Sequence, residues 1–235
     1  MPALPISQLP TSAALTGVEL LPAVQDGATV RATVAQLRAG LAEVAHGHAL
    51  ADVSGLPAAL ASKRAVGRRS LWLPAATLNA PASGGAVAGS TDSPSHGVVL
   101  RTLDFAADAV TTAQALIALP KAWNRGSLTV QPLWTASGGG GSVVWSVGGV
   151  ALGDGDGLDA AGGAPVTLTD ALTTADALHA APESPAITLA GTPTADGLTL
   201  LTIARAAEDA ADTLDAPARL LGLRVFYLVD AASDD

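Results

Sequence analysis

Two of the four histidines in the chain, His46 and His48, stand on either side of Gly47 in the segment AHGHALADVSGLPAALASK. Residues two apart in an extended backbone point to the same side, so both imidazoles would face one direction. Imidazole is a common ligand of transition metals, and the pair is therefore a candidate set of metal ligands. The alternative interpretation is a solvated turn at Gly47 in which neither ring binds a metal.

Tryptophan is the second residue type with recognition chemistry in this chain, in which only 3% of residues are aromatic. Indole rings are amphipathic and stack on sugar faces. The four tryptophans are Trp72, Trp123, Trp134 and Trp145. Trp134 and Trp145 stand in uncharged alternating segments, which predicts that both are core residues. Trp123 stands in the polar segment KAWNRG beside Asn124 and Arg125, and these three residues are the predicted ligand-contact site, with a structural cap on a sandwich end as the alternative for the ring.

Two other polar clusters lack the spacing of known motifs. The segment GDGDGLDA at 153–160 offers three aspartates to calcium but departs from the EF-hand loop, and tight turns use the same residues. The segment GSTDSPSHG at 89–97 gathers serines, an aspartate and a histidine without the GxSxG elbow of serine hydrolases. Glutamate occurs at only four positions, so a glycosidase would have to draw its carboxylates from aspartate. We therefore expect no enzymatic activity.

The charge of the chain is unevenly distributed. The net charge is −9, and residues 1–70 carry six basic and four acidic side chains, whereas residues 71–235 carry six basic and seventeen acidic ones. An acidic body is repelled by phosphate backbones and by anionic lipids, so we expect neither nucleic acid nor membrane as a partner. The chain has no cysteine, which excludes disulfides, thiolate metal sites and thiol nucleophiles.

Hydrophobic residues alternate with a period of two from about residue 70 onward, which indicates strands. Clusters of Gly, Pro, Asp and Ser separate about nine such segments, and this pattern favours an antiparallel β-sandwich of the jelly-roll type. The expected strands are 71–73, 98–103, 113–119, 128–134, 143–147, 166–169, 187–190, 198–205 and 221–229. The run GGGG at 138–141 is an expected turn between two buried strands, and a little helix is expected around 174–180.

Two further zones precede the β-rich part. Residues 1–40 contain a predicted hairpin that turns at Gln25-Asp26-Gly27, followed by a short helix with apolar residues at spacings of three and four. Residues 41–69 show helical spacing from Leu50 to Leu60, although Gly55 and Pro57 disfavour a stable lone helix. We therefore divide the chain at 1–40, 41–69 and 70–235, with the first zone too small to bury a core of its own.

Segments in each of these three zones resemble parts of phage fibre proteins. Positions 6–37, ISQLPTSAALTGVELLPAVQDGATVRATVAQL, are similar to the adaptor pattern ISxLPxxxxLTGxExxPVVQxGxTVxxTxxxL. The segment HGHALADVSGLPAALASK resembles the HxHxIxDVxGLxxxLxxK segment of tail-fibre shafts, with a departure at Ala49–Leu50. The segments LRTLDF, LPKAWNRGSLTVQPLW and LRVFYLVDAASDD resemble a β domain found at the ends of phage and prophage fibres.

The resemblance implies a homotrimeric tail fibre or head spike on the surface of a phage particle or a gene transfer agent. Residues 1–40 would attach to other virion proteins, 41–69 would form the shaft, and the β-sandwich knob at 70–235 would bind a polysaccharide of the host surface. Three parallel chains would bring six imidazoles of His46 and His48 to one axis, where the resemblance implies a transition metal such as iron. The alternative is a purely architectural protein that decorates the head or connects another fibre.

Overall fold

The structure, a computed structural model, describes residues 14, 16–39, 49–93, 95–231 and 234. The chain divides into two compact units, Met1–Ser54 and Gly55–Asp235, which are described separately. His46 and His48 lie outside the described residues.

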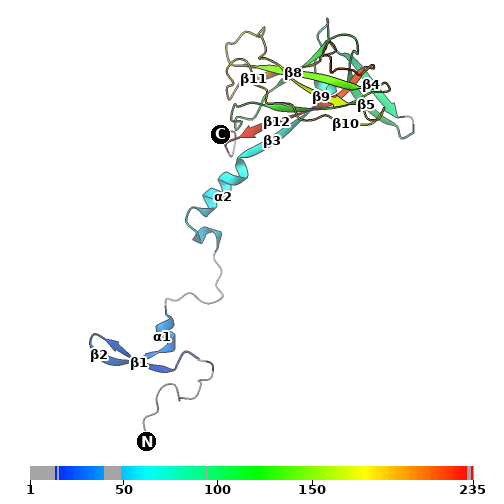
Figure 1. Ribbon diagram of the computed structural model, residues 1–235. Helices are drawn as coiled ribbons and strands as arrows, with labels where there is room; N and C mark the ends of the chain where they lie inside the picture. The colour runs from blue at the N-terminus through cyan, green and yellow to red at the C-terminus, as the bar shows by residue number, and fades with distance from the viewer. Residues whose placement is uncertain (1–13, 15, 40–48, 94, 232–233, 235) are drawn as a thin grey trace. The chain divides into compact units, whose positions relative to one another are not determined.

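The first unit contains a two-stranded hairpin formed by β1 (Leu20–Gln25) and β2 (Ala28–Thr33) (Figure 1). Asp26 and Gly27 connect the strands with φ angles of 51° and 79°. Two consecutive positive φ values are typical of the tight turns whose twist matches that of the strands, and Asp-Gly is a preferred pair there. The predicted hairpin and its turn are confirmed.

Local polar contacts hold the ends of this hairpin. Helix α1 (Val34–Arg38) begins with a capping box in which Thr33 and Gln36 exchange hydrogen bonds. The Glu19 carboxylate accepts hydrogen bonds from the backbone N–H and the hydroxyl of Thr16 and from the N–H of Gly17. These bonds stabilise the ionised form, first of all the one from the Thr16 backbone, and lower the pKa of Glu19 to about 2.

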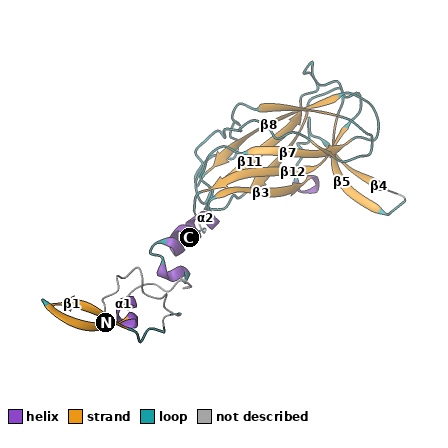
Figure 2. Ribbon diagram, turned by 60° about the horizontal axis from the view of Figure 1, so that its bottom comes forward, coloured by secondary structure: helices purple, strands orange, loops and turns teal. Residues whose placement is uncertain are grey.

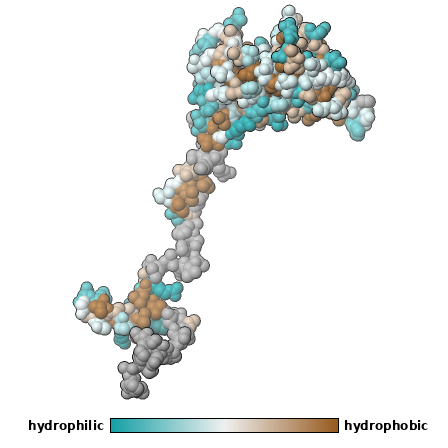
Figure 3. All heavy atoms as spheres, in the orientation of Figure 1, coloured by the Kyte–Doolittle hydropathy of each residue, from teal (hydrophilic) through white to brown (hydrophobic). Residues whose placement is uncertain are grey.

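Most apolar side chains of this unit are exposed. Val34 is the one buried residue among those described here. Six large apolar residues are 43% to 75% exposed, namely Val18, Leu20, Leu21, Val24, Leu37 and Val53. Figure 3 shows hydrophobic residues gathered around α1. The described residues of this unit therefore do not bury a core of their own, as its small size predicts.

A short 3₁₀ turn, η2 (Leu50–Asp52), and a ten-residue helix, α2 (Leu56–Ala65), follow. Gly55 precedes the helix with a φ of 79°, and Pro57 lies within its first turn. Proline is tolerated in the first turn because its missing N–H would have no intrahelical partner there. The position of Pro57 explains why a helix forms across a segment in which glycine and proline seemed unfavourable.

The second unit is an antiparallel β-sandwich, as the alternating pattern predicted (Figures 1 and 2). One sheet has the order β10-β7-β12-β5-β4, with β3 also paired to β12, and the other has the order β6-β11-β8-β9. The strands of the six-stranded sheet are β3 (Gly67–Pro74), β4 (Val87–Ser93), β5 (Val98–Phe105), β7 (Thr129–Thr135), β10 (His179–Ala180) and β12 (Ala218–Val229). Those of the four-stranded sheet are β6 (Thr111–Ile117), β8 (Ser142–Leu152), β9 (Val166–Ala171) and β11 (Leu198–Arg205).

The strand orders β3-β12-β7-β10 and β6-β11-β8-β9 are those of a jelly roll, in which the chain repeatedly crosses from one sheet to the other. The hairpin β4–β5 is added at one edge of this arrangement. It is joined to β12 through only three residues, Ala218–Leu220. The turn η3 (Ala75–Thr77) links β3 to the segment before β4.

Aromatic side chains fill the middle of the sandwich. Trp134 and Trp145 are fully buried with their ring centres 6.3 Å apart, and Phe105 packs edge-on against Trp145 at 5.1 Å. The Trp134 indole N–H donates to the Asp170 carboxylate at 2.8 Å. Both predicted core tryptophans are confirmed, and edge-to-face packing is a favourable arrangement of such rings.

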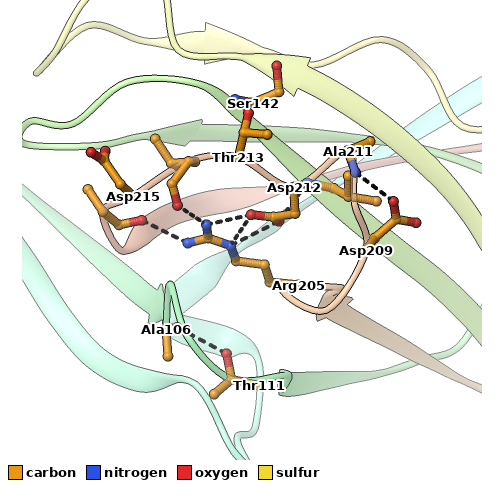
Figure 4. A network of polar contacts seen from close by, with 12 residues as sticks. Ala106, Thr111, Ser142, Arg205, Asp209, Ala211, Asp212, Thr213 and Asp215 are labelled. Carbon is orange, nitrogen blue, oxygen red and sulfur yellow. Dashed lines mark hydrogen bonds and ion pairs between the residues drawn. The ribbon is translucent and has the colours of Figure 1, made fainter.

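A buried ion pair fastens the loop between β11 and β12 to the sandwich (Figure 4). The Arg205 guanidinium and the Asp212 carboxylate are 0% and 1% exposed, and their closest atoms, Nη2 and Oδ1, are 2.7 Å apart. Arg205 also donates to the carbonyls of Leu214 and Ala216, and Asp212 accepts from the Val144 N–H. Each charge therefore has several partners, as burial of an ion pair requires.

The same loop holds the predicted glycine turn at 138–141. The Asp215 carboxylate accepts from the Gly140 N–H at 2.8 Å, and the Thr213 hydroxyl accepts from the Ser142 N–H at 3.0 Å. The turn connects β7 and β8, which confirms its predicted place between two buried strands.

Three predictions about local structure were wrong. Residues 174–180 contain β10 instead of a helix, and 187–190 form isolated bridges to Leu128 and Val150 instead of a strand. The expected loop at 89–97 is largely strand, because Ser90, Asp92 and Ser93 belong to β4. In each case the pairing with another segment of the chain decided the conformation, and a pattern within one segment does not reveal that partner.

Candidate functional site

The structure places Trp123 inside the protein. Its side chain is 4% exposed and belongs to the hydrophobic core, and its backbone bridges to Val229 at the end of β12. The indole N–H is buried without a hydrogen-bond partner. This position corresponds to the structural alternative for the ring, since no face of the indole is open to a sugar.

Asn124 and Arg125 are exposed beside it. The Asn124 side chain accepts a hydrogen bond from the Gly126 N–H at 2.9 Å, and Arg125 has a φ of 58°. Asparagine commonly closes such turns through its own side chain. The three residues predicted to act together are therefore separated: one ring faces the core and two side chains form an exposed turn.

The aspartates considered as calcium ligands are not brought together, and the predicted metal ligands His46 and His48 lie outside the described residues. Across those residues no group of three or more His, Asp or Glu side chains is arranged to hold a metal ion. Asp154 and Asp159 are exposed, and the Asp156 carboxylate accepts from the Gly153 N–H at 2.7 Å, as in an ordinary turn.

Trp72 is the one tryptophan with an accessible ring, and all four tryptophans lie in the described part of the chain. It is 44% exposed and lies on β3 between Leu71 and Leu73, which pack against the core. Successive residues of a strand point to opposite faces, so Trp72 projects from the outer face of the six-stranded sheet. The ring is consequently available to a partner.

Trp72 belongs to a row of three side chains across neighbouring strands. Arg224 of β12 pairs with Trp72 of β3 on one side and with Gln131 of β7 on the other. Residues directly opposite each other in antiparallel strands have β-carbons about 5 Å apart and share a face. The Arg224 guanidinium is 3.4 Å from the Gln131 side-chain oxygen. We call these three residues the Trp72 row.

A glycine leaves room for the Trp72 ring beside β12. A β-carbon added at Gly222 would lie 2.5 Å from the ring atom Cη2 of Trp72 and 2.5 Å from the carbonyl oxygen of Leu73. Such distances are far inside van der Waals contact, so only glycine leaves room for the indole there. Gly222 follows a β-bulge at Leu221, and bulges commonly redirect side chains at functional surfaces.

A cluster of side chains around Arg68 stabilises the neighbouring part of this face. Arg68 lies over the Phe226 ring at 3.9 Å, and its guanidinium donates to Glu183 and to the Thr129 hydroxyl. The hydrogen bond from Arg68 holds the pKa of Glu183 below its usual value, with a smaller effect from Thr129. The same bond raises the pKa of Arg68. Both charges are thus engaged within the protein.

The outer face of the four-stranded sheet is different in character. Its outward positions include Thr112, Gln114, Thr202, Ala204, Ser146, Gly148, Thr167 and Thr169, none of which is charged. A cavity of about 340 Å³ lies there, lined by Ser146, Thr202, Pro165 and several glycines. Small hydroxyl and glycine groups supply neither an aromatic platform nor a charge.

Sequence reasoning missed Trp72 because it searched for a tryptophan in a polar segment. A signal was nevertheless present. The alternation in SLWLP puts Leu71 and Leu73 on one face, and if that face is the core, Trp72 must point outward. Strand alternation cannot be applied to KAWNRG, because residues 120–125 form a turn and bridges instead of a strand.

No family model matches the sequence, and no curated protein matches it. Three solved structures share features of the fold. The Clostridium thermocellum family 11 carbohydrate-binding module, solved with a β-1,3-1,4-mixed-linked tetrasaccharide, has 9% identity and a TM-score of 0.37, covering 70% of this chain and 97% of the module. The enzymatically active domain of bacteriophage CBA120 tailspike protein 4 has 8% identity and a TM-score of 0.32, covering 65% and 19%.

The third is the infectious bursal disease virus Gt strain, with 15% identity, a TM-score of 0.25 and coverage of 94% of this chain and 48% of that one. All three are similar to this chain only at low identity and low TM-score. In the described part of the present chain, no helix is both long and apolar enough to span a bilayer.

Proposed function

We propose that this protein is a fibre or spike on the surface of a phage-type particle and attaches the particle to a host cell by binding a surface polysaccharide. The observation that supports this most is the Trp72 row. It presents an accessible indole beside a planar guanidinium and an amide on a flat sheet face. Aromatic platforms with a few polar groups are suited to sugars, which have apolar faces and hydroxyl edges.

The two-unit organisation supports a role in attachment. The first unit leaves six large apolar side chains exposed, and such surfaces mark interaction sites with other proteins. Docking on virion proteins would cover them and leave the sandwich free to meet the host. Weak contacts are sufficient for this purpose, since several copies on one particle raise the effective affinity without new contacts.

The proposal includes a homotrimer in which His46 and His48 of each chain bind a transition metal at the trimer axis. Light scattering on the full chain should give three times the mass of one chain, 23.1 kDa. Metal analysis of that species, compared with His46→Ala, would test the metal site. A monomer without bound transition metal would overturn both the homotrimer and the metal site.

We propose that binding occurs without cleavage of the polysaccharide. The test uses the full chain and a panel of bacterial capsular and exopolysaccharides, with retention on each polymer as the measurement. Wild type should be retained by at least one polymer and leave its length unchanged, and Trp72→Ala should lose at least about 30-fold in affinity. Leu116→Ala, a control on the four-stranded sheet at a side chain 53% exposed, should bind normally.

Equal binding by Trp72→Ala and wild type would overturn the assignment of the site. The purely architectural alternative predicts no retention on any polymer.

A further inference from the structure

We infer that the Trp72 row selects acidic polysaccharides, and that Arg224 pairs with a carboxylate of the sugar while Trp72 stacks on the ring. This inference rests on the proposed function and names the chemical class of its ligand. It follows from an account of the charges on the outer face of the six-stranded sheet.

Two of the three guanidinium groups from Arg68, Arg219 and Arg224 already face a carboxylate. Arg68 is hydrogen-bonded to Glu183. The Arg219 Nε atom lies 3.6 Å from an Asp104 oxygen, which is an ion pair longer than a hydrogen bond. Within each of these two pairs the carboxylate offsets most of the charge of the guanidinium.

Arg224 is the exception. It is exposed, its one polar contact within the described part of the chain is the 3.4 Å contact with the neutral Gln131 oxygen, and it forms no ion pair with the described carboxylates. A protein with 21 acidic and 12 basic residues could readily supply a carboxylate for it. The guanidinium beside the exposed indole is instead left for an external anion.

The geometry of the row suits a uronic acid or another carboxylated sugar. A guanidinium presents two parallel N–H groups that match the two oxygens of a carboxylate. Trp72 and Arg224 are cross-strand neighbours, so a ring stacked on the indole brings its substituents within reach of the guanidinium. Gln131 adds an amide on the far side of Arg224.

The protein's net charge of −9 opposes the binding of an acidic polymer at long range. Any preference for an acidic polymer must therefore come from a short-range match at one cationic site. Nonspecific electrostatic attraction would require a cationic surface, whereas residues 71–235 carry six basic and seventeen acidic side chains.

The experiment measures affinity of the full chain for matched polymers that differ only in charge. The probes are polygalacturonate, alginate and polysialic acid, each compared with its carboxyl-reduced counterpart. We expect at least about tenfold tighter binding to one or more acidic polymers than to its reduced partner. Arg224→Gln should abolish that preference. Arg224→Lys should keep part of it, because lysine retains the positive charge but lacks the two parallel N–H groups of the guanidinium.

The control variant is Arg125→Gln, which removes an exposed guanidinium from the turn beside Trp123 and should keep the preference. Equal, Trp72-dependent affinity for acidic and reduced polymers would overturn this inference and leave glycan binding standing. Retention of no polymer of either kind would overturn both. An Arg224→Gln variant that keeps the preference, or a change of oligomeric state in that variant, would also overturn the inference, the latter by assigning the face to a second copy of the chain.

Discussion

The two outer faces of the sandwich lie over the same core but present opposite chemistry. The six-stranded face carries an exposed indole, three guanidinium groups and the Phe226 ring. The four-stranded face carries uncharged side chains at its outward positions, including threonines, small residues, glycines and the leucines Leu116, Leu198 and Leu200. Packing against a shared core constrains the inward side chains of both sheets alike. The outward side chains are not under that constraint and can differ according to what each face contacts.

The comparison teaches that exposure and chemistry together identify the recognition face. An exposed apolar side chain alone is common on folded proteins. Leu116 on the four-stranded face is more exposed than Trp72, yet it lacks a polar neighbour comparable to Arg224. The Trp72 row combines an aromatic surface with a guanidinium that forms no ion pair with the described carboxylates, and we propose it as the glycan-binding site.

The largest expected effect comes from the buried ion pair of Arg205 and Asp212, which holds the loop between β11 of one sheet and β12 of the other. Asp212→Asn leaves the buried Arg205 guanidinium without its countercharge and should lower the free energy of unfolding by about 3–5 kcal/mol. Denaturant titration of the full chain measures this loss. The double variant Arg205→Met with Asp212→Leu removes both charges and should recover much of it.

If both sheets share one core, Asp212→Asn should destabilise the two sheets together, in a single unfolding transition. A variant that unfolds one sheet and leaves the other intact, seen as two separate transitions, would contradict a shared core.

A smaller effect is expected at Gly222, which belongs only to the six-stranded face. Gly222→Ala places a methyl group against the Trp72 ring and the Leu73 carbonyl, so the indole must move. We expect a loss of about 1–3 kcal/mol in stability, typical of overpacking, and polysaccharide affinity close to that of Trp72→Ala. The matched control is Gly157→Ala, where an added β-carbon meets no atom within 4 Å.

Unchanged polysaccharide binding by a folded Gly222→Ala protein would show that the observed position of the Trp72 ring is not required.

The smallest expected effect is a pH dependence confined to the six-stranded face. Because the folded pKa of Glu183 lies below its unfolded value of 4.5, its ion pair with Arg68 stabilises the protein above that pH and is lost as the pH falls toward the folded pKa. The pair is partly exposed, so we expect less than about 1 kcal/mol. The measurement compares unfolding free energies of wild type and Glu183→Gln from pH 6 to pH 3.

The difference between the two proteins should shrink as the pH falls. A difference that grows toward pH 3 would contradict the sign of the pKa shift.

Features encoded in a short stretch of sequence could be predicted. The hairpin turn at Asp26-Gly27 depends on two residues that accept a positive φ, and the core positions of Trp134 and Trp145 follow from alternation in uncharged segments. The jelly-roll type of sandwich follows from many short strands separated by turn residues.

Features that depend on how segments pair in the folded chain could not be predicted. Strand β4 has few apolar residues and becomes a strand through its pairing with β5. The partner of Arg205 is seven residues away across a folded loop, and nothing in that spacing marks it as buried. Trp123 was assigned from its polar neighbours, but its bridge to Val229 at the far end of the chain turns it inward.

Selective oxidation of exposed indoles by N-bromosuccinimide, read by mass spectrometry, tests most directly whether the six-stranded face is the binding face. Trp72 should react first because the other three tryptophans are buried. Saturating acidic polysaccharide should protect it, and oxidised protein should no longer be retained on that polymer. Trp72 oxidation at an unchanged rate in the saturated complex would contradict this account.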